Sequence, residues 1–197
     1  MKSNICIIKQ GGFGLKSVLT ETKKVIVYNE LQQKEALRLN LLAEELVGML
    51  SELMKDFEGC FWIQNDGNRY ELHAEISVER LDKEKKEELI AISANKKNAA
   101  ASGFMGKIRD IAENMLLSSD DYPIYPCVPE FDGYTLSDIH YTYAWSLDYY
   151  VNQQKLKDTE GGNDWDELEK SIVANLADDV IVGVRGKKVE IIIKKEF

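Results

Sequence analysis

The sequence predicts an α+β fold, a two-layer sandwich in which helices cover one face of a mixed, mostly antiparallel sheet. Short β-branched runs lie near both ends of the chain, and a long run with helical spacing extends from about residue 31 to 57. Tight turns at Asp66-Gly67 and Arg185-Gly186 join further strand-like segments. Such hairpins favour antiparallel neighbours, and an amphipathic helix must bury its apolar stripe against another element.

The N-terminal part is expected to contribute two strands. NICIIK (4 to 9) and KKVIVYNE (23 to 30) are rich in β-branched residues, which are frequent in strands. The glycine-rich stretch QGGFG (10 to 14) lies between them. It lacks the GK[ST] ending of a phosphate-binding P-loop, so a hairpin connection is the favoured interpretation.

The long helix is predicted from its apolar spacing. Residues three and four positions apart lie on one face of a helix, so a repeat of this kind marks a buried stripe. Arg38, Glu45 and Glu52 follow one heptad apart on another face. The apolar stripe comprises Leu39, Leu42, Ala43, Leu46, Leu50, Leu53, Met54 and Phe57.

The rest of the chain is expected to complete one domain covering residues 1–197. An irregular Tyr/Pro-rich segment at about 118–150 interrupts it, because all three prolines of the chain fall there. No repeat divides the chain. The expected elements are a hairpin over 61–79, helices over 83–98, 107–116, 137–157 and from Asp164 to Leu176, and a terminal hairpin.

Composition limits the classes of partner. The chain has 25 Lys plus Arg against 34 Asp plus Glu, a formal net charge of −9, so nucleic acid and anionic membranes are not expected partners. The cysteines form no CxxC pair, and the first residues resemble neither a signal peptide nor a membrane span. These features predict a cytoplasmic protein. His73 and His140 lie far apart in the sequence, without zinc-ligand spacing.

Glu44 and Glu45 interrupt an apolar stretch of the long helix. A carboxylate at the edge of an apolar face can have its pKa raised by desolvation and act as a general base. Both side chains could equally point into solvent beside the buried stripe, as most helical glutamates do.

The segment LLAEELVGML, followed by a strand hairpin and a later glycine-bearing helix start, resembles the ATP-binding domain shared by histidine kinases, gyrase-type topoisomerases, MutL and anti-sigma-factor serine kinases, the GHKL family. In that family a long helix carries a catalytic Glu and, four residues on, an Asn that ligates magnesium. The resemblance places Glu45 at the Glu position and Met49 at the Asn position. Aligning Glu44 with Gly48 instead does not restore the Asn.

The other family motifs fall later in the chain. Asp82 is the nearest match to the aspartate that holds adenine, but no DxGxG glycines follow it. The segment containing Gly103, Gly106 and Lys107 resembles the glycine-rich end of the ATP lid, where backbone N–H groups and a lysine would face phosphate. The same glycines would also fit a helix break with close packing.

The resemblance implies a regulatory domain that binds ATP or ADP, with weak or no phosphoryl transfer because the magnesium ligand is missing. The alternative is a degenerate member of the same fold that has lost nucleotide and binds a protein partner. The tyrosine-rich region or an exposed sheet edge would then form its interaction surface.

Overall fold

The computed structural model describes residues 1–53, 57–77, 143–149, 151–152, 171–185 and 188–197. The described strands form one sheet of six strands in the order β1-β2-β3-β6-β5-β4. The strands are β1 (Cys6–Lys9), β2 (Glu58–Asp66), β3 (Arg69–Ser77), β4 (Tyr143–Ser146), β5 (Asp179–Arg185) and β6 (Lys188–Glu196). The helices are α1 (Leu15–Tyr28), α2 (Gln33–Leu53) and α7 (Ile172–Leu176).

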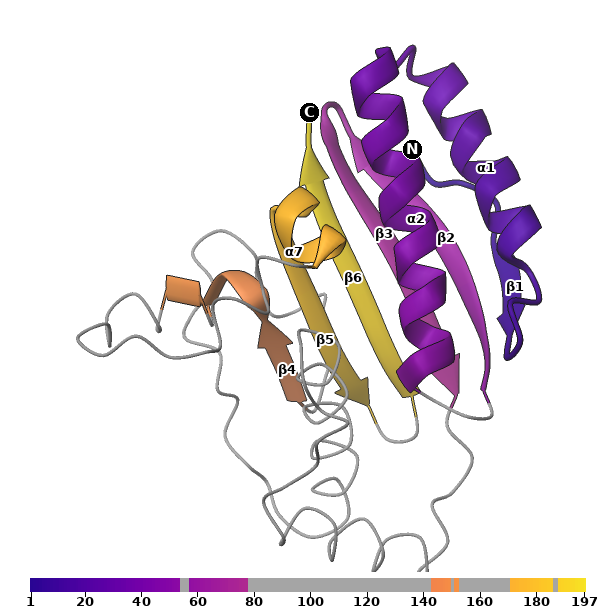
Figure 1. Cartoon of the computed structure of the whole chain (residues 1–197), viewed down its shortest axis with the longest axis vertical. Helices are drawn as coiled ribbons and strands as arrows, with labels where there is room; N and C mark the ends of the chain where they lie inside the picture. Colours follow the sequence, from indigo (N-terminus) through magenta and orange to yellow (C-terminus); the bar gives the residue numbers. More distant parts are fainter. Residues whose placement is uncertain (54–56, 78–142, 150, 153–170, 186–187) are drawn as a thin grey trace, which may run out of the picture.

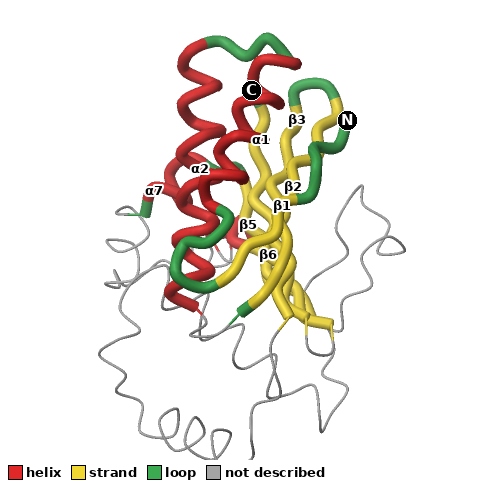
Figure 2. The backbone as a smooth tube through the Cα atoms, turned by 90° about the vertical axis from the view of Figure 1, so that its right-hand side faces the viewer, coloured by secondary structure: helices red, strands yellow, loops and turns green. Residues whose placement is uncertain are grey.

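The predicted α+β architecture is confirmed. The helices α1, α2 and α7 lie on one face of the sheet, which makes a helix layer and a strand layer (Figures 1 and 2). Every described strand pairing is antiparallel, so this part of the sheet is not mixed. The β2–β3 and β5–β6 hairpins meet along β3 and β6, which places the C-terminal strand beside β3 at the centre of the sheet, while β1 lies at one edge.

The prediction of a strand over 23–30 is wrong, because residues 23–28 belong to α1 and Asn29 and Glu30 form the turn after it. Val18, Thr22 and Val25, spaced by four and three, are its buried residues and pack as a helical stripe. Burial of this stripe outweighs the strand preference of the Val/Ile-rich run. The QGGFG stretch therefore leads from β1 into a helix rather than into a second strand.

The long helix is confirmed as α2, with bounds a few residues inside the predicted ones. The stripe residues for which side-chain burial is described all lie in the core, and Phe57 is buried just outside the helix, before β2. Leu39, Leu42, Ala43, Leu46 and Leu50 are each 0% exposed. At 20 to 30 cal/mol per Å² of apolar surface, each large side chain contributes about 1.5 to 3 kcal/mol of burial.

Both predicted hairpins form. Asp66 pairs with Arg69, so the first turn is at Gly67-Asn68, one residue later than expected, and Gly67 has the positive φ of 58°. In the second hairpin Arg185 pairs with Lys188, which encloses residues 186–187.

The prediction of a helix over 137–157 is wrong for its described N-terminal part. Residues 143–146 form β4, which pairs antiparallel with β5, and helical structure begins at Leu147. Residues 143–146 contain no β-branched residue, yet they form a strand because the edge of β5 is available for pairing. The helix predicted to end at Leu176 is represented by α7, where Ser171 caps the N-terminus by accepting from Ala174 N.

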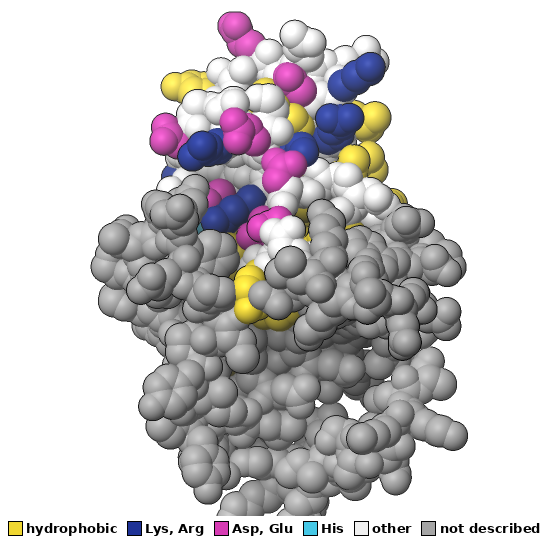
Figure 3. All heavy atoms as spheres, turned by 90° about the vertical axis from the view of Figure 1, so that its left-hand side faces the viewer, with side chains coloured by type: hydrophobic (Ala, Val, Ile, Leu, Met, Phe, Trp, Pro, Cys, Tyr) yellow, Lys and Arg dark blue, Asp and Glu magenta, His cyan; other side chains and the backbone are white. Residues whose placement is uncertain are grey.

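The core lies between the helix layer and the sheet. It includes Leu46 and Leu50 of α2 and Leu72, Ile191 and Ile193 of the central strands, all 0% exposed. Figure 3 shows acidic and basic side chains mixed over the described part of one side of the molecule. Among the described residues, no helix has the length and apolar character needed to cross a membrane.

Candidate functional site

The two glutamates predicted from the sequence lie in the C-terminal half of α2. The side chain of Glu44 is exposed and that of Glu45 is half-buried. Residues four positions apart in a helix are separated by about 6 Å along its axis, slightly more than one turn. Glu44 therefore shares a face with Gly48, and Glu45 shares one with Met49.

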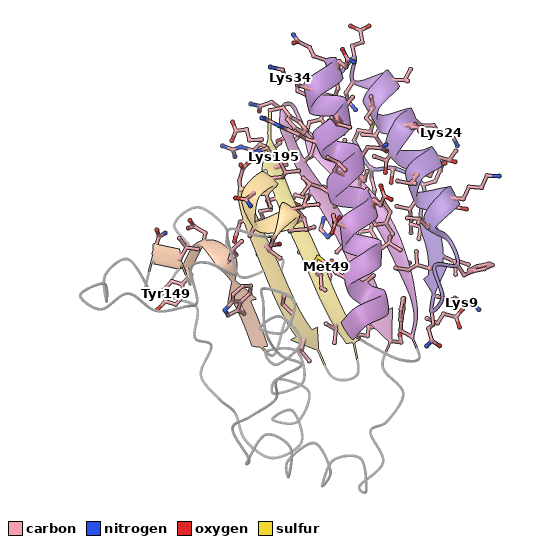
Figure 4. The ribbon with its side chains drawn as sticks, in the orientation of Figure 1. Lys9, Lys24, Lys34, Met49, Tyr149 and Lys195 are labelled. Carbon is pink, nitrogen blue, oxygen red and sulfur yellow. The ribbon has the colours of Figure 1, made fainter. Side chains whose placement is uncertain are left out.

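Met49 belongs to the hydrophobic core, with 3% of its surface exposed. Figure 4 labels it on the part of α2 that lies over the sheet. A thioether is a soft, weak ligand, whereas magnesium takes oxygen ligands in octahedral geometry. Met49, which the resemblance aligns with a magnesium ligand, therefore does not fit that ion, and it acts as a packing residue.

Gly48 is exposed in the interior of α2. A Cβ built there meets no atom within 4 Å among the described residues, so packing does not explain the glycine. An interior helix glycine costs about 1 kcal/mol relative to alanine. Among the described residues, the strip from Glu44 to Gly48 is thus a place where the helix backbone is open to close approach.

The remaining predicted site residues cannot be placed beside these. Asp82, Gly103, Gly106 and Lys107 lie outside the described residues, as do residues 118–142 of the Tyr/Pro-rich segment. The structure therefore places Glu44, Glu45 and Met49 on one helix, with Glu44 exposed and Met49 in the core, while the adenine-side and phosphate-side predictions fall outside the described residues.

A second cluster of polar side chains lies on the opposite face of the sheet. Leu72 and Ala74 belong to the core under the helices, so His73 between them points the other way. Its Nδ1 lies 2.8 Å from Oε1 of Glu190, and its Nε2 lies 3.3 Å from Oε2 of Glu71. The first contact is a hydrogen bond, while Nε2 makes none and the second contact is electrostatic.

The environment of His73 favours its charged form. Only 8% of its surface is exposed, and this burial alone would lower the pKa of His73, but the carboxylates of Glu190 and Glu71 raise it above its ordinary value. In turn, the imidazole lowers the pKa of Glu71. The imidazole also stacks on Trp62 of β2, with ring centroids 4.8 Å apart and an interplanar angle of 7°.

The sequence analysis missed this cluster. The alternation Glu71, His73, Glu75 places three polar side chains on one strand face, and that is the only local signal. The essential partner, Glu190, lies 117 positions away in the sequence. Only the pairing of β3 with β6 brings it to the histidine.

The cysteines that the structure describes do not form a reactive centre. Cys6 is buried and Cys60 is half-buried, and both are free thiols. Desolvation raises the pKa of both thiols, which disfavours the nucleophilic thiolate. Within the described ranges, no three His, Cys, Asp or Glu side chains are arranged to hold a metal ion.

Comparison with known proteins identifies no relative: no family model, no curated protein and no solved structure matches this chain.

Proposed function

We propose that this chain is a regulatory domain that binds ATP or ADP at the C-terminal half of α2, with weak or no phosphoryl-transfer activity. The order of elements supports the proposal: a long helix, then the β2–β3 hairpin, and a closing β5–β6 hairpin. This order agrees with the resemblance to the histidine-kinase-like ATP-binding domain. The fold alone does not establish a function, so the proposal depends on the helix surface.

The observation that carries the proposal is the open strip on α2. Glu44 and Gly48 are exposed one turn apart, Glu45 is half-buried beside them, and Gly48 has no packing partner among the described residues. A glycine inside a helix destabilises it by about 1 kcal/mol relative to alanine, and its lack of a side chain lets a ligand approach the helix backbone closely. Glu45 lies at the border of the apolar stripe and is the carboxylate that we propose to contact the bound nucleotide or a water beside it.

Magnesium has no ligand at the position where the family supplies one, because Met49 is buried in the core. We therefore assign no catalytic step to a metal. Glu45 alone can hold or orient a proton-bearing group, which supports binding more than phosphoryl transfer.

The proposal is tested by thermal denaturation with and without millimolar ATP or ADP, in the presence of magnesium. A ligand that binds only the folded state at 100 times its Kd adds about 2.7 kcal/mol to the free energy of unfolding. We expect a raised midpoint with either nucleotide, and a smaller shift for Glu45→Gln. Leu37→Ala, an exposed change about two turns before Glu45 on α2, is the matched control. An unchanged wild-type midpoint would refute nucleotide binding.

The second candidate is a protein-interaction module of the same fold. It is favoured by exposed apolar side chains near the α1–α2 connection: Val27 and Tyr28 are 75% and 74% exposed, and Leu37 is 60% exposed. Large exposed apolar groups on neighbouring helices can form a docking surface. If nucleotide gives no shift, replacing Val27 and Tyr28 by Ser should weaken association with a partner without lowering the unfolding midpoint.

A further inference from the structure

We infer that Glu71, His73 and Glu190 form a proton-dependent latch that joins β3 to β6 on the sheet face away from the helices. The latch is independent of the nucleotide proposal, since it uses other residues on the other face. It holds the junction at which the N-terminal and C-terminal hairpins meet, because β3 and β6 are neighbours in the sheet.

The geometry favours an imidazolium. A neutral imidazole carries one N–H and one lone pair, so it can donate toward one carboxylate only. Here each ring nitrogen faces a carboxylate oxygen, at 2.8 Å for Glu190 and 3.3 Å for Glu71. With both nitrogens protonated, both contacts are attractive. When the imidazolium loses one proton, the lone pair of one ring nitrogen faces a negatively charged carboxylate oxygen. The positive charge that lay between the two carboxylates is then gone.

The aromatic neighbour of the histidine adds a second attraction that depends on the same proton. Trp62 lies parallel to the imidazole, and Lys2 Nζ lies 4.6 Å from the centroid of the Trp62 ring. Lys2 forms a β-bridge with Gln64 on one side of β2, and His73 belongs to β3 on the other side. The indole of Trp62 therefore lies between these two segments. The electron-rich indole face favours a cation, and this favours the imidazolium.

Two lysines of β6 and a thiol of β2 lie beside the carboxylates of this strand face. Lys194 of β6 lies 3.8 Å from Glu71, and Lys188 of β6 lies 2.6 Å from Glu75 of β3. Cys60 of β2 pairs with Glu75 in the sheet, and burial raises the pKa of this thiol. The lysines stabilise the carboxylates, so Glu71 remains ionised and available to the histidine over the range in which the histidine titrates.

The latch is tested on the whole chain by proton NMR of the two histidines during a pH titration, with His140→Gln and His73→Gln to assign the signals. We expect the titration midpoint of His73 to lie above the unperturbed value of about 6.5. Glu190→Gln should lower this midpoint, and Trp62→Phe should lower it less. A midpoint of His73 at or below about 6.5 in the unmodified chain would overturn the proposal.

A second measurement keeps the test decisive if His73→Gln does not fold. Urea denaturation of the unmodified chain and of Glu190→Gln is compared at pH values below and above the measured midpoint of His73. The unmodified chain should lose stability across that midpoint, and the variant should lose clearly less. Equal losses in the two proteins would show that the Glu190 contact is not coupled to the proton, and would overturn the latch.

Discussion

The carbonyl oxygen of Ile7 lies 2.2 Å from the place where a Cβ on Gly14 would stand. Gly14 also has a φ of 95°, a conformation that L side chains rarely adopt. The missing side chain thus lets the loop after β1 fold back on the strand and start α1 at Leu15. The turn from strand to helix depends on this contact between backbone atoms.

We therefore predict that Gly14→Ala lowers the free energy of unfolding by about 2 to 4 kcal/mol, since it adds a backbone clash to an unfavourable φ. Urea denaturation followed by far-UV circular dichroism measures the change. Gly11→Ala is the matched control: Gly11 also has a positive φ, of 74°, but a Cβ there meets no described atom within 4 Å. The control should lose about 1 to 2 kcal/mol. Equal losses for both variants would contradict the steric role of Ile7.

Gly48→Ala should have opposite effects on stability and binding. In the absence of nucleotide it should raise the free energy of unfolding by about 0.5 to 1 kcal/mol, because alanine is the better helix former and the site has room for a methyl group. If the nucleotide approaches the helix backbone there, the same methyl group should reduce the midpoint shift caused by ATP. A stabilised variant with an unchanged ATP shift would place the ligand elsewhere.

How far the sequence predicted the structure depended on the length of each pattern. α2 spans 21 residues, so its helical spacing is repeated often enough to distinguish it from a strand. The run Lys23 to Glu30 is too short for that distinction, and its Val and Ile residues suggest a strand although they belong to a helix. The helical stripe of α1 becomes visible only when Val18 and Thr22, before that run, are included.

The candidate sites were predictable from the sequence only where the signal is local. Glu44 and Glu45 were found because they interrupt an apolar helix, and their environment follows from the period of that helix. The latch could not be found in this way, since His73 and Glu190 are brought together by strand pairing across most of the chain. A side chain in the middle of a strand carries no local signal of its cross-strand neighbour.

The two glutamates of the latch should affect His73 unequally. Glu190 accepts a hydrogen bond at 2.8 Å, whereas Glu71 makes a longer, undirected contact. We expect Glu190→Gln to lower the pKa of His73 more than Glu71→Gln does, as measured by proton NMR. Glu75→Gln is the control, because Glu75 lies on the same strand face but pairs with Lys188. A larger effect of Glu71→Gln would indicate that charge, rather than the hydrogen bond, sets the pKa.

The raised pKa of His73 also fixes the direction in which stability depends on pH. A group whose pKa is higher in the folded chain stabilises that chain fully below its unfolded pKa of about 6.5 and loses this contribution as the pH rises through the folded pKa. We therefore expect the urea concentration at the unfolding midpoint of the unmodified chain to decrease as the pH is raised above about 6.5. The midpoint of His73→Gln should change less over the same range. If the urea midpoint of the unmodified chain instead increased with pH above about 6.5, and that of His73→Gln did not, the pKa of His73 would be lowered by folding, which would contradict the latch.

Nucleotide binding, if it occurs at α2, should depend little on magnesium. The resemblance aligns Met49 with a magnesium ligand, but Met49 is 3% exposed and offers a thioether in place of an oxygen. We expect ATP to raise the unfolding midpoint by a similar amount with excess magnesium and with EDTA, each measured against the same buffer without nucleotide. A shift that appears only with magnesium would show that another residue supplies the ligand. In that case Glu45→Gln separates the alternatives, because it should abolish the magnesium-dependent part if Glu45 is that residue.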